Sequence, residues 1–106
     1  MPRPLGMHNY FVYIVTNKNK YVLYIGVTNN LRRRLYEHEF DGSIAEDNQH
    51  FTHKYKTHYL IYWERFGDIQ QAIAREKEIK GWRRSKKEKL ISEFNPEWVF
   101  LNDEVE

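Results

Sequence analysis

The sequence predicts an α+β domain in which a small, three-stranded, largely antiparallel sheet is flanked by helices, in the order ββαβαα. Two β-branched and aromatic runs lie on either side of the turn-forming stretch TNKNK, and a third such run contains YLIYW. Helix-start signals follow the second and third runs. The length of 106 residues suits one compact domain and leaves no room for a second.

The three strands are expected where Val, Ile, Tyr and Phe are concentrated. The first two are placed at residues 10–15 and 21–27, on either side of TNKNK. The third is placed at residues 58–64. Residues 41–56 are polar and rich in histidine, show no clear period and are predicted to be mostly loop.

The register of the first two strands follows from the length of their loop. If Thr16 pairs with Tyr21 around four residues, Tyr13 falls directly opposite Tyr24. Directly opposed residues share a face of the sheet. The sequence therefore predicts two phenols together on one face.

The first helix is expected to begin at Leu31, with Asn29 or Asn30 as its cap. At about 100° per residue, Leu31, Leu35, Arg34 and His38 fall within one sector of this helix. Arg32 and Arg33 point elsewhere, toward water. One arginine and one histidine are therefore predicted to face the sheet beside leucines.

The two later helices start with capping-box patterns, in which a Gln or Glu follows the cap by three positions. Asp68 starts a helix expected to run from Ile69 to about Lys80, and Ser85 starts a last helix that Asn95-Pro96 closes. The apolar stripe of the helix at 69–80 surrounds a carboxylate, Glu76. The stripe consists of Ile69, Ala72, Ile73 and Ile79.

An ionised group that faces a core is costly unless it is paired, hydrogen-bonded or bound to a metal. A buried salt bridge between Arg34 and Glu76 is one explanation of the pattern. The other is a cleft in which the carboxylate holds a cation and the arginine meets an anion. Both explanations stay open on residue positions alone.

Charge is distributed unevenly although the net charge is only +2. Residues 80–89 contain six bases and one acid, and residues 97–106 contain four acids and no base. Contact with a polyanion, tempered by an acidic tail, is one interpretation, and a solvated helix face is the other. We divide the chain into an N-terminal tail at 1–8, a domain at 9–98 and an acidic tail at 99–106.

Two classes of structure are excluded by composition. Cysteine is absent, so disulfide partners and thiolate metal sites are ruled out. No apolar run approaches the roughly 18 to 20 residues that cross a bilayer, and the start of the chain lacks the apolar core of a secretory signal. We expect a cytoplasmic protein without a membrane partner.

Several of these residues stand in motifs. FVY ends in Tyr13, and YIG begins at Tyr24. The arginine ten residues after the second tyrosine is Arg34, and His38 follows one helical turn later. AREKEIKGW carries Glu76. In order and spacing, these motifs resemble those of the GIY-YIG nuclease superfamily.

The resemblance covers roughly residues 9–98 and is greatest to the small single-domain bacterial members, relatives of the nuclease domain of the excision-repair C subunit and of homing endonucleases. Phe11 and Val12 replace the Gly and Ile of the first motif. Asn95 is a candidate for a further site asparagine of the family. We expect no separate recognition domain.

The resemblance implies hydrolysis of a nucleic-acid phosphodiester, DNA above all, with one Mg²⁺ or Mn²⁺ ion. Glu76 would supply a metal ligand and Arg34 would bind phosphate oxygens. A tyrosine would orient or deprotonate the attacking water, and Tyr13 is favoured slightly over Tyr24. His38 would relay the proton, hold a tyrosine hydroxyl, or simply pack between helix and sheet.

The remaining candidates concern binding. Gly26 is expected to allow a close approach of chain or phosphate near the strand end. Lys54 and Tyr55 place a basic and an aromatic side chain in one loop, a combination that also occurs where proteins contact nucleic acids. The basic segment is expected to follow phosphates through Lys80, Arg83, Arg84, Lys86 and Lys87.

A metal-dependent nuclease acting on DNA or a related structured nucleic acid, in repair or processing, is therefore the expected function. Two rivals remain. One is a nucleic-acid-binding module of the same fold with little turnover. The other is a small basic interaction protein whose Arg34–Glu76 pair is structural.

Overall fold

The structure is a computed structural model that describes residues 9–40 and 56–105. Lys54 and Tyr55 lie outside the described residues, as do the tail at 1–8 and most of the expected loop. The elements confirm the α+β class and the order ββαβαα. They are β1 (Tyr10–Thr16), β2 (Leu23–Thr28), α1 (Leu31–Phe40), β3 (Tyr59–Phe66), α3 (Ile69–Lys80), α4 (Arg84–Phe94) and a short 3₁₀ turn, η1 (Asn102–Glu104).

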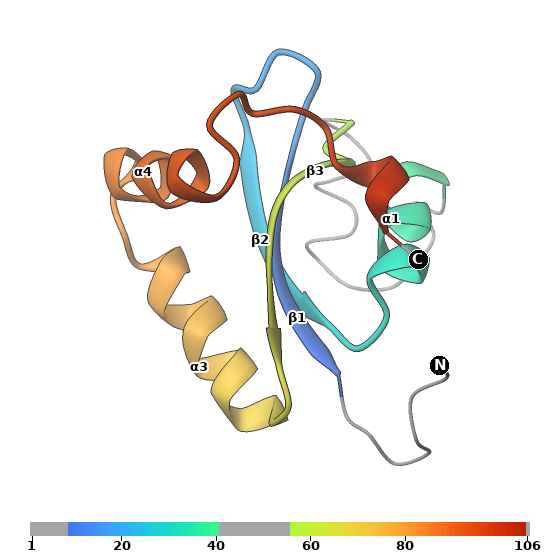
Figure 1. The fold of residues 1–106 in the computed structure, drawn as a ribbon, viewed down its shortest axis with the longest axis vertical. Coiled ribbons are helices and arrows are strands. Elements are labelled where there is room, and N and C mark those ends of the chain that lie inside the picture. Colours follow the sequence, from blue (N-terminus) through green and yellow to red (C-terminus); the bar gives the residue numbers. More distant parts are fainter. Residues whose placement is uncertain (1–8, 41–55, 106) are drawn as a thin grey trace.

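The sheet has the order β2-β1-β3 and is antiparallel throughout. Figure 1 shows α3 and α4 on one face of the sheet, and α1 with the C-terminal turn on the other. Among the described helices, none is long and apolar enough to span a bilayer.

The central strand β1 is buried on both faces, which explains its nearly continuous apolar and aromatic sequence. Its alternate residues enter two separate cores. The core on the α3–α4 face contains Val12, Ile14, Ile25, Ile61, Tyr62, Ala72, Ile79 and Ile91. The core on the α1 face contains Tyr13, Val15, Leu31, Leu35, Leu60 and Leu101.

The predicted register of β1 and β2 is wrong by two residues. Tyr13 pairs with Gly26, and Tyr24 pairs with Val15. The cause is Asn17, whose side-chain oxygen accepts the backbone N–H groups of Tyr21 and Val22 at 2.8 and 3.1 Å and delays the start of β2. Because side chains alternate with a period of two, this shift leaves both phenols on the same face.

A β-bulge interrupts the pairing of β1 with β3. Ile14 pairs with Tyr62 and Val15 with Leu60, so Ile61 is the extra residue. The carbonyl of Ile61 accepts a hydrogen bond of 3.1 Å from the side chain of Asn95, just after α4. Asn95 therefore provides a hydrogen-bond donor for the backbone carbonyl at the bulge, and it joins the end of α4 to the sheet.

Helix starts follow the predictions in two of three cases. Asn30 Oδ1 accepts the backbone N–H of Arg33 at 3.0 Å and caps α1, and Asp68 caps α3. The predicted cap at Ser85 is wrong, because α4 begins at Arg84 and its N-cap is Arg83, two residues before Ser85. The side chain of Arg84 instead donates to the carbonyls of Lys20 and Tyr21 in the β1–β2 turn.

The segment expected to form an acidic tail packs against β3. Leu101 is buried, and its N–H donates to the carbonyl of Leu60 at 2.7 Å. The Asn102 side chain accepts from Leu60 N at 2.8 Å and donates to the carbonyl of His58 at 2.8 Å. The folded unit thus continues to η1, past the boundary expected at residue 98.

Candidate active site on the α1 face

The Tyr13 hydroxyl is the centre of a polar cluster inside the α1-face core. It lies 2.7 Å from His38 Nε2 and accepts a hydrogen bond of 3.3 Å from Arg34 Nε. Tyr13 is 0% exposed and His38 is 1% exposed. The polar groups that the sequence places on the sheet-facing side of the first helix therefore meet one phenol in the interior.

The Tyr13 ring lies over Gly26, its partner on β2. A methyl group added at Gly26 would stand 2.9 Å from Tyr13 Cε2 and closer still to Cζ and the hydroxyl oxygen. Real Cβ atoms do not approach other atoms so closely, so the missing side chain of Gly26 makes the space that the ring occupies. The close approach expected at this glycine is that of the Tyr13 ring.

His38 is held in its neutral form. Burial above all, followed by the positive charges of Arg34 and His58, lowers the pKa of His38 to about 3. Arg34 can only donate, so the Tyr13 oxygen accepts from Arg34 Nε, and the Tyr13 hydroxyl shares a second hydrogen bond with His38 Nε2 whose direction follows the imidazole tautomer.

This low pKa bears on whether His38 relays a proton. An imidazole whose pKa is lowered so far is a weak base. This favours a partner that orients the Tyr13 hydroxyl over a group that removes its proton.

Tyr24 is the more accessible phenol of the pair. It is half-buried on edge strand β2, with its ring centroid 6.4 Å from that of Tyr13 and 5.2 Å from that of His38. An attacking water needs direct contact with the group that orients it. Burial therefore points to Tyr24, whereas the sequence favours Tyr13 slightly.

Arg34 joins the buried cluster to the surface. Its side chain is 15% exposed and forms an ion pair of 3.1 Å with Glu37. With Arg33, it lines an open pocket of about 280 Å³ where β2 ends and α1 begins. Arg33 is 56% exposed, as expected for a residue that points toward water. Two guanidinium groups at one opening suit an anion such as a phosphate.

Glu76 lies apart from this cluster. It is on α3, which packs on the opposite face of the sheet (Figure 1). Its carboxylate is 14% exposed and forms an ion pair of 2.7 Å with Lys80. The alternative of a buried Arg34–Glu76 salt bridge is wrong, because Arg34 pairs with Glu37 and Glu76 with Lys80.

A divalent cation can be tested against this donor set. Within residues 9–40 and 56–105, no group of three or more His, Cys, Asp or Glu side chains gathers as a metal cage. A single carboxylate fits Mg²⁺ or Mn²⁺ bound mainly by water and phosphate. Glu76 is such a carboxylate, and the ammonium of Lys80 now provides the positive charge that a cation would bring.

The basic segment is partly engaged within the molecule. Besides Lys80 with Glu76, Arg84 pairs with Glu88 at 2.8 Å, and Lys86 Nζ lies 4.3 Å from the ring centroid of Trp82. Arg83 is exposed and Lys87 half-buried. The five basic residues expected to follow phosphates are therefore not equivalent.

Two features of the site were missed in the sequence. Glu37, the partner of Arg34, stands three residues later on the same helix, a spacing at which opposite charges meet. The second is a pocket beside the cluster, lined in part by Trp63 and Arg65. Its walls come from distant segments, so no local pattern indicates it.

Asn95, a candidate site residue, instead donates hydrogen bonds to the Ile61 and Val99 carbonyls.

Several known proteins are similar to most of this chain. The model of the GIY-YIG catalytic domain matches residues 9–89. A UPF0213 protein of Natronomonas pharaonis is 33% identical over 80% of this chain and 93% of its own. A UPF0213 protein of Staphylococcus saprophyticus is 36% identical over 82% of this chain and 99% of its own.

A solved structure is also similar. The solution NMR structure of the UPF0213 protein BH0048 from Bacillus halodurans is 29% identical, covers 79% of this chain and 83% of its own, and gives a TM-score of 0.47. The family model spans most of the chain and includes Tyr13, Tyr24, Arg34, His38 and Glu76. The chain therefore belongs to the GIY-YIG catalytic domain family.

Proposed function

We propose that this protein is a divalent-metal-dependent endonuclease that hydrolyses phosphodiester bonds of DNA in repair or processing. One observation carries the proposal: Tyr13, Tyr24, Arg34 and His38 come together on one sheet face from β1, β2 and α1. Packing alone does not require an arginine and a histidine on one buried phenol, since burying polar groups costs free energy. Membership of a catalytic-domain family agrees with the proposal.

Arg34 is the residue that binds the scissile phosphate. Its guanidinium is reached from the open pocket and can donate two parallel hydrogen bonds to non-bridging oxygens. Its Nε atom stays on the Tyr13 hydroxyl. The phosphate is thereby placed beside the two phenols.

Tyr24 is the residue that contacts the attacking water. Ionising an ordinary phenol at pH 7 costs roughly 4 kcal/mol, and the positive charge of Arg34 offsets part of that cost. Tyr13 acts through its neighbours: with His38 it holds the Arg34 side chain in place.

Glu76 is the residue that would hold the Mg²⁺ or Mn²⁺ ion. When bound, the ion stabilises negative charge on the phosphate and the leaving oxygen. β2 is an edge strand, with Tyr24 on one face and α3 packed on the other. A phosphodiester that crosses this edge can meet groups from both faces.

The experiment is nicking of supercoiled DNA with Mg²⁺, with Mn²⁺ and with a chelator. We expect nicking with either metal and none with the chelator. Glu76→Gln should abolish it, and Glu78→Gln, on the exposed side of the same helix, should not. A Glu76→Gln protein that nicks at the wild-type rate would remove the metal-ligand assignment.

A binding module with little turnover is the second candidate. The burial of Tyr13 and His38, and the position of Glu76 across the sheet with its oxygen on Lys80, favour it. Such a protein would retard DNA in a gel without nicking it under any metal condition. Retardation together with metal-dependent nicking would exclude it.

A further inference from the structure

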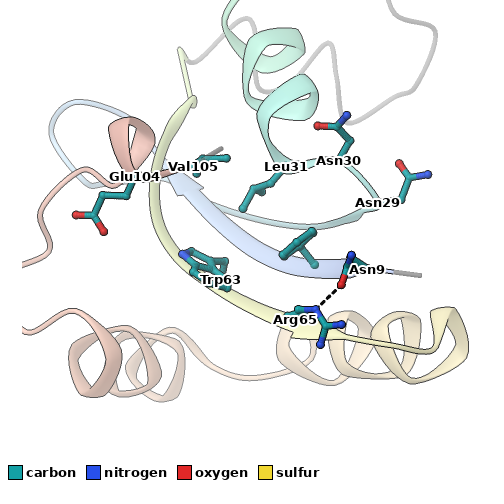
Figure 2. A pocket seen from close by; sticks show the side chains of 9 residues that line it. Asn9, Asn29, Asn30, Leu31, Trp63, Arg65, Glu104 and Val105 are labelled. Atoms are coloured by element: carbon teal, nitrogen blue, oxygen red, sulfur yellow. Dashed lines mark hydrogen bonds between the residues drawn. The ribbon is translucent and has the colours of Figure 1, made fainter. Parts of the chain in front are cut away.

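A second pocket, of about 380 Å³, opens beside the polar cluster on the α1 face. Figure 2 shows Asn9, Asn29, Asn30, Leu31, Trp63 and Arg65 around it. Phe11 also lines it, and Glu104 and Val105 approach it from the C-terminal turn. Small organic ligands bind in pockets of about 300 to 1,000 Å³ that combine apolar walls with a few polar groups. This pocket has both properties.

The apolar wall is aromatic. The Phe11 and Trp63 rings lie edge to face, with centroids 6.0 Å apart and an interplanar angle of 69°. Neither ring is fully buried. A flat aromatic ligand can stack on such rings, which nucleic-acid-binding proteins use as platforms for bases.

The polar wall carries amides and a guanidinium. The Asn9 side-chain oxygen accepts a hydrogen bond from Arg65 Nε, drawn in Figure 2. Asn29 Oδ1 accepts from Arg33 at 3.0 Å, and Asn30 is the cap of α1. Amide and guanidinium groups are those that recognise base edges. The pocket therefore suits a planar ring that has hydrogen-bonding groups on its edge.

The pocket adjoins the candidate active site through two elements. Phe11 precedes Tyr13 by two residues on the same face of β1, a rise of about 7 Å. Leu31 lies almost one helical turn before Arg34 on α1. One nucleotide advances a DNA strand by about 3.4 Å along a duplex and by more when the strand is extended. A nucleotide within about two positions of the phosphate at Arg34 is thus in reach.

We propose that this pocket binds one unpaired base of the nucleic acid, close to the phosphate that Arg34 holds. The inference rests on the proposed function, because it assumes that the strand passes Arg34. A base inside a duplex has both faces stacked and its edge paired, so it cannot enter. The protein therefore prefers a nucleotide that is already unpaired, or one whose extrusion costs little.

The test measures binding in the presence of a chelator, so that no probe is cleaved. Three duplex probes share one sequence: a fully paired duplex, one with a single extrahelical nucleotide, and one with an abasic residue at the extrahelical position. The wild type should bind the base-containing probe about tenfold more tightly than the abasic probe, as expected for one stacked base. The fully paired duplex should bind no better than the abasic probe.

Two variants change the pocket in different ways. Trp63→Leu removes the stacking surface, and Val105→Trp fills the space from the C-terminal turn. Either should bring the base-containing and abasic probes to the same affinity. Trp98→Leu, at a tryptophan of the opposite core, should keep the tenfold difference. Thermal melting identifies a variant that does not fold. The comparison of base-containing and abasic probes then rests on the variant that does fold.

The outcomes separate this inference from the nuclease proposal. Equal binding of base-containing and abasic probes by the wild type overturns the pocket, even when supercoiled DNA is nicked. A tenfold difference that persists in both folded variants, or no binding of any probe, also overturns it. A difference that both variants abolish supports the pocket, and it does so even when no nicking is found.

Discussion

The two faces of β1 are built from alternating residues of one strand, but they contribute differently to the structure. Val12 and Ile14 enter a core toward α3 and α4 whose buried members are aliphatic apart from Tyr62. Tyr13, between them, enters a core that also buries the imidazole of His38 and receives the Arg34 side chain. The first face supplies apolar burial, and the second combines packing with hydrogen bonds.

The contrast shows how a polar site is kept inside a small domain. Burying a polar group costs free energy unless it is hydrogen-bonded, and burying a charge costs more. The α1 face meets both conditions, because the Tyr13 hydroxyl is bonded on two sides and His38 stays neutral. Its charged member, Arg34, is the one that reaches the surface.

The largest expected effect is on the aliphatic face. Ile14→Ala should lower the free energy of unfolding by about 2 to 5 kcal/mol, because Ile14 is 0% exposed and its truncation leaves a cavity. Nicking per folded molecule should stay at the wild-type level. Urea denaturation followed by fluorescence measures the first quantity. A selective loss of nicking in a stably folded Ile14→Ala protein would show that the faces are not separable.

The next effect is on the chemistry of the polar face. Tyr24→Phe should lower the single-turnover cleavage rate at least about a hundredfold, because it removes the hydroxyl that we propose to contact the attacking water. Tyr13→Phe should lower the rate less and cost about 1 kcal/mol of stability, because the hydrogen bond to His38 is removed. If Tyr13→Phe instead lowers the rate more than Tyr24→Phe does, Tyr13 is the phenol that acts on the attacking water.

A smaller effect concerns acid stability. Below an unfolded pKa of about 6.5, the unfolded chain protonates His38 while the folded chain, with a pKa of about 3, does not. Stability from this group is therefore complete above pH 6.5 and is lost as the pH falls toward 3. The loss at pH 4.5 should be on the order of 3 kcal/mol. Denaturation across pH should show a shallower acid slope for His38→Gln, and equal slopes would contradict the buried neutral imidazole.

The smallest effect is on the basic segment. Arg83 and Lys87 form no ion pair with the described residues, whereas Arg84 pairs with Glu88 and holds the β1–β2 turn. Replacing Arg83 and Lys87 with neutral residues should reduce the slope of log affinity against log salt. The expected reduction is about 0.9 for each phosphate contact that is lost. Arg84→Gln should instead lower stability. An unchanged salt slope in the double variant would assign both charges to solubility.

The sequence predicts the elements of this fold better than their exact pairing. The hydrophobic runs and the caps at Asn30 and Asp68 are local signals, and they place the three strands and helices α1 and α3, although β2 begins two residues later than expected. The register and the start of α4 depend on contacts that the local pattern does not contain. Asn17 captures two N–H groups beside β2, and Arg84 reaches carbonyls more than 60 residues away.

The same distinction applies to the site. Tyr13, Tyr24, Arg34 and His38 lie within one ββα unit, so alternation and helical period are enough to bring them together. Glu76 comes from a later helix, and nothing in its own stripe tells which face of the sheet that helix covers. The roles of all five residues in hydrolysis remain predictions that the variants above test.

The contacts along β3 bear on association between molecules. β3 is an edge of the sheet, and an edge strand offers unpaired backbone groups to the strands of other chains. Here Leu101 and the Asn102 side chain occupy the N–H and carbonyl of Leu60 and the carbonyl of His58. The C-terminal segment thus acts as a short, non-propagating strand mimic at the start of this edge, so its removal should turn that part of the edge into a template for aggregation.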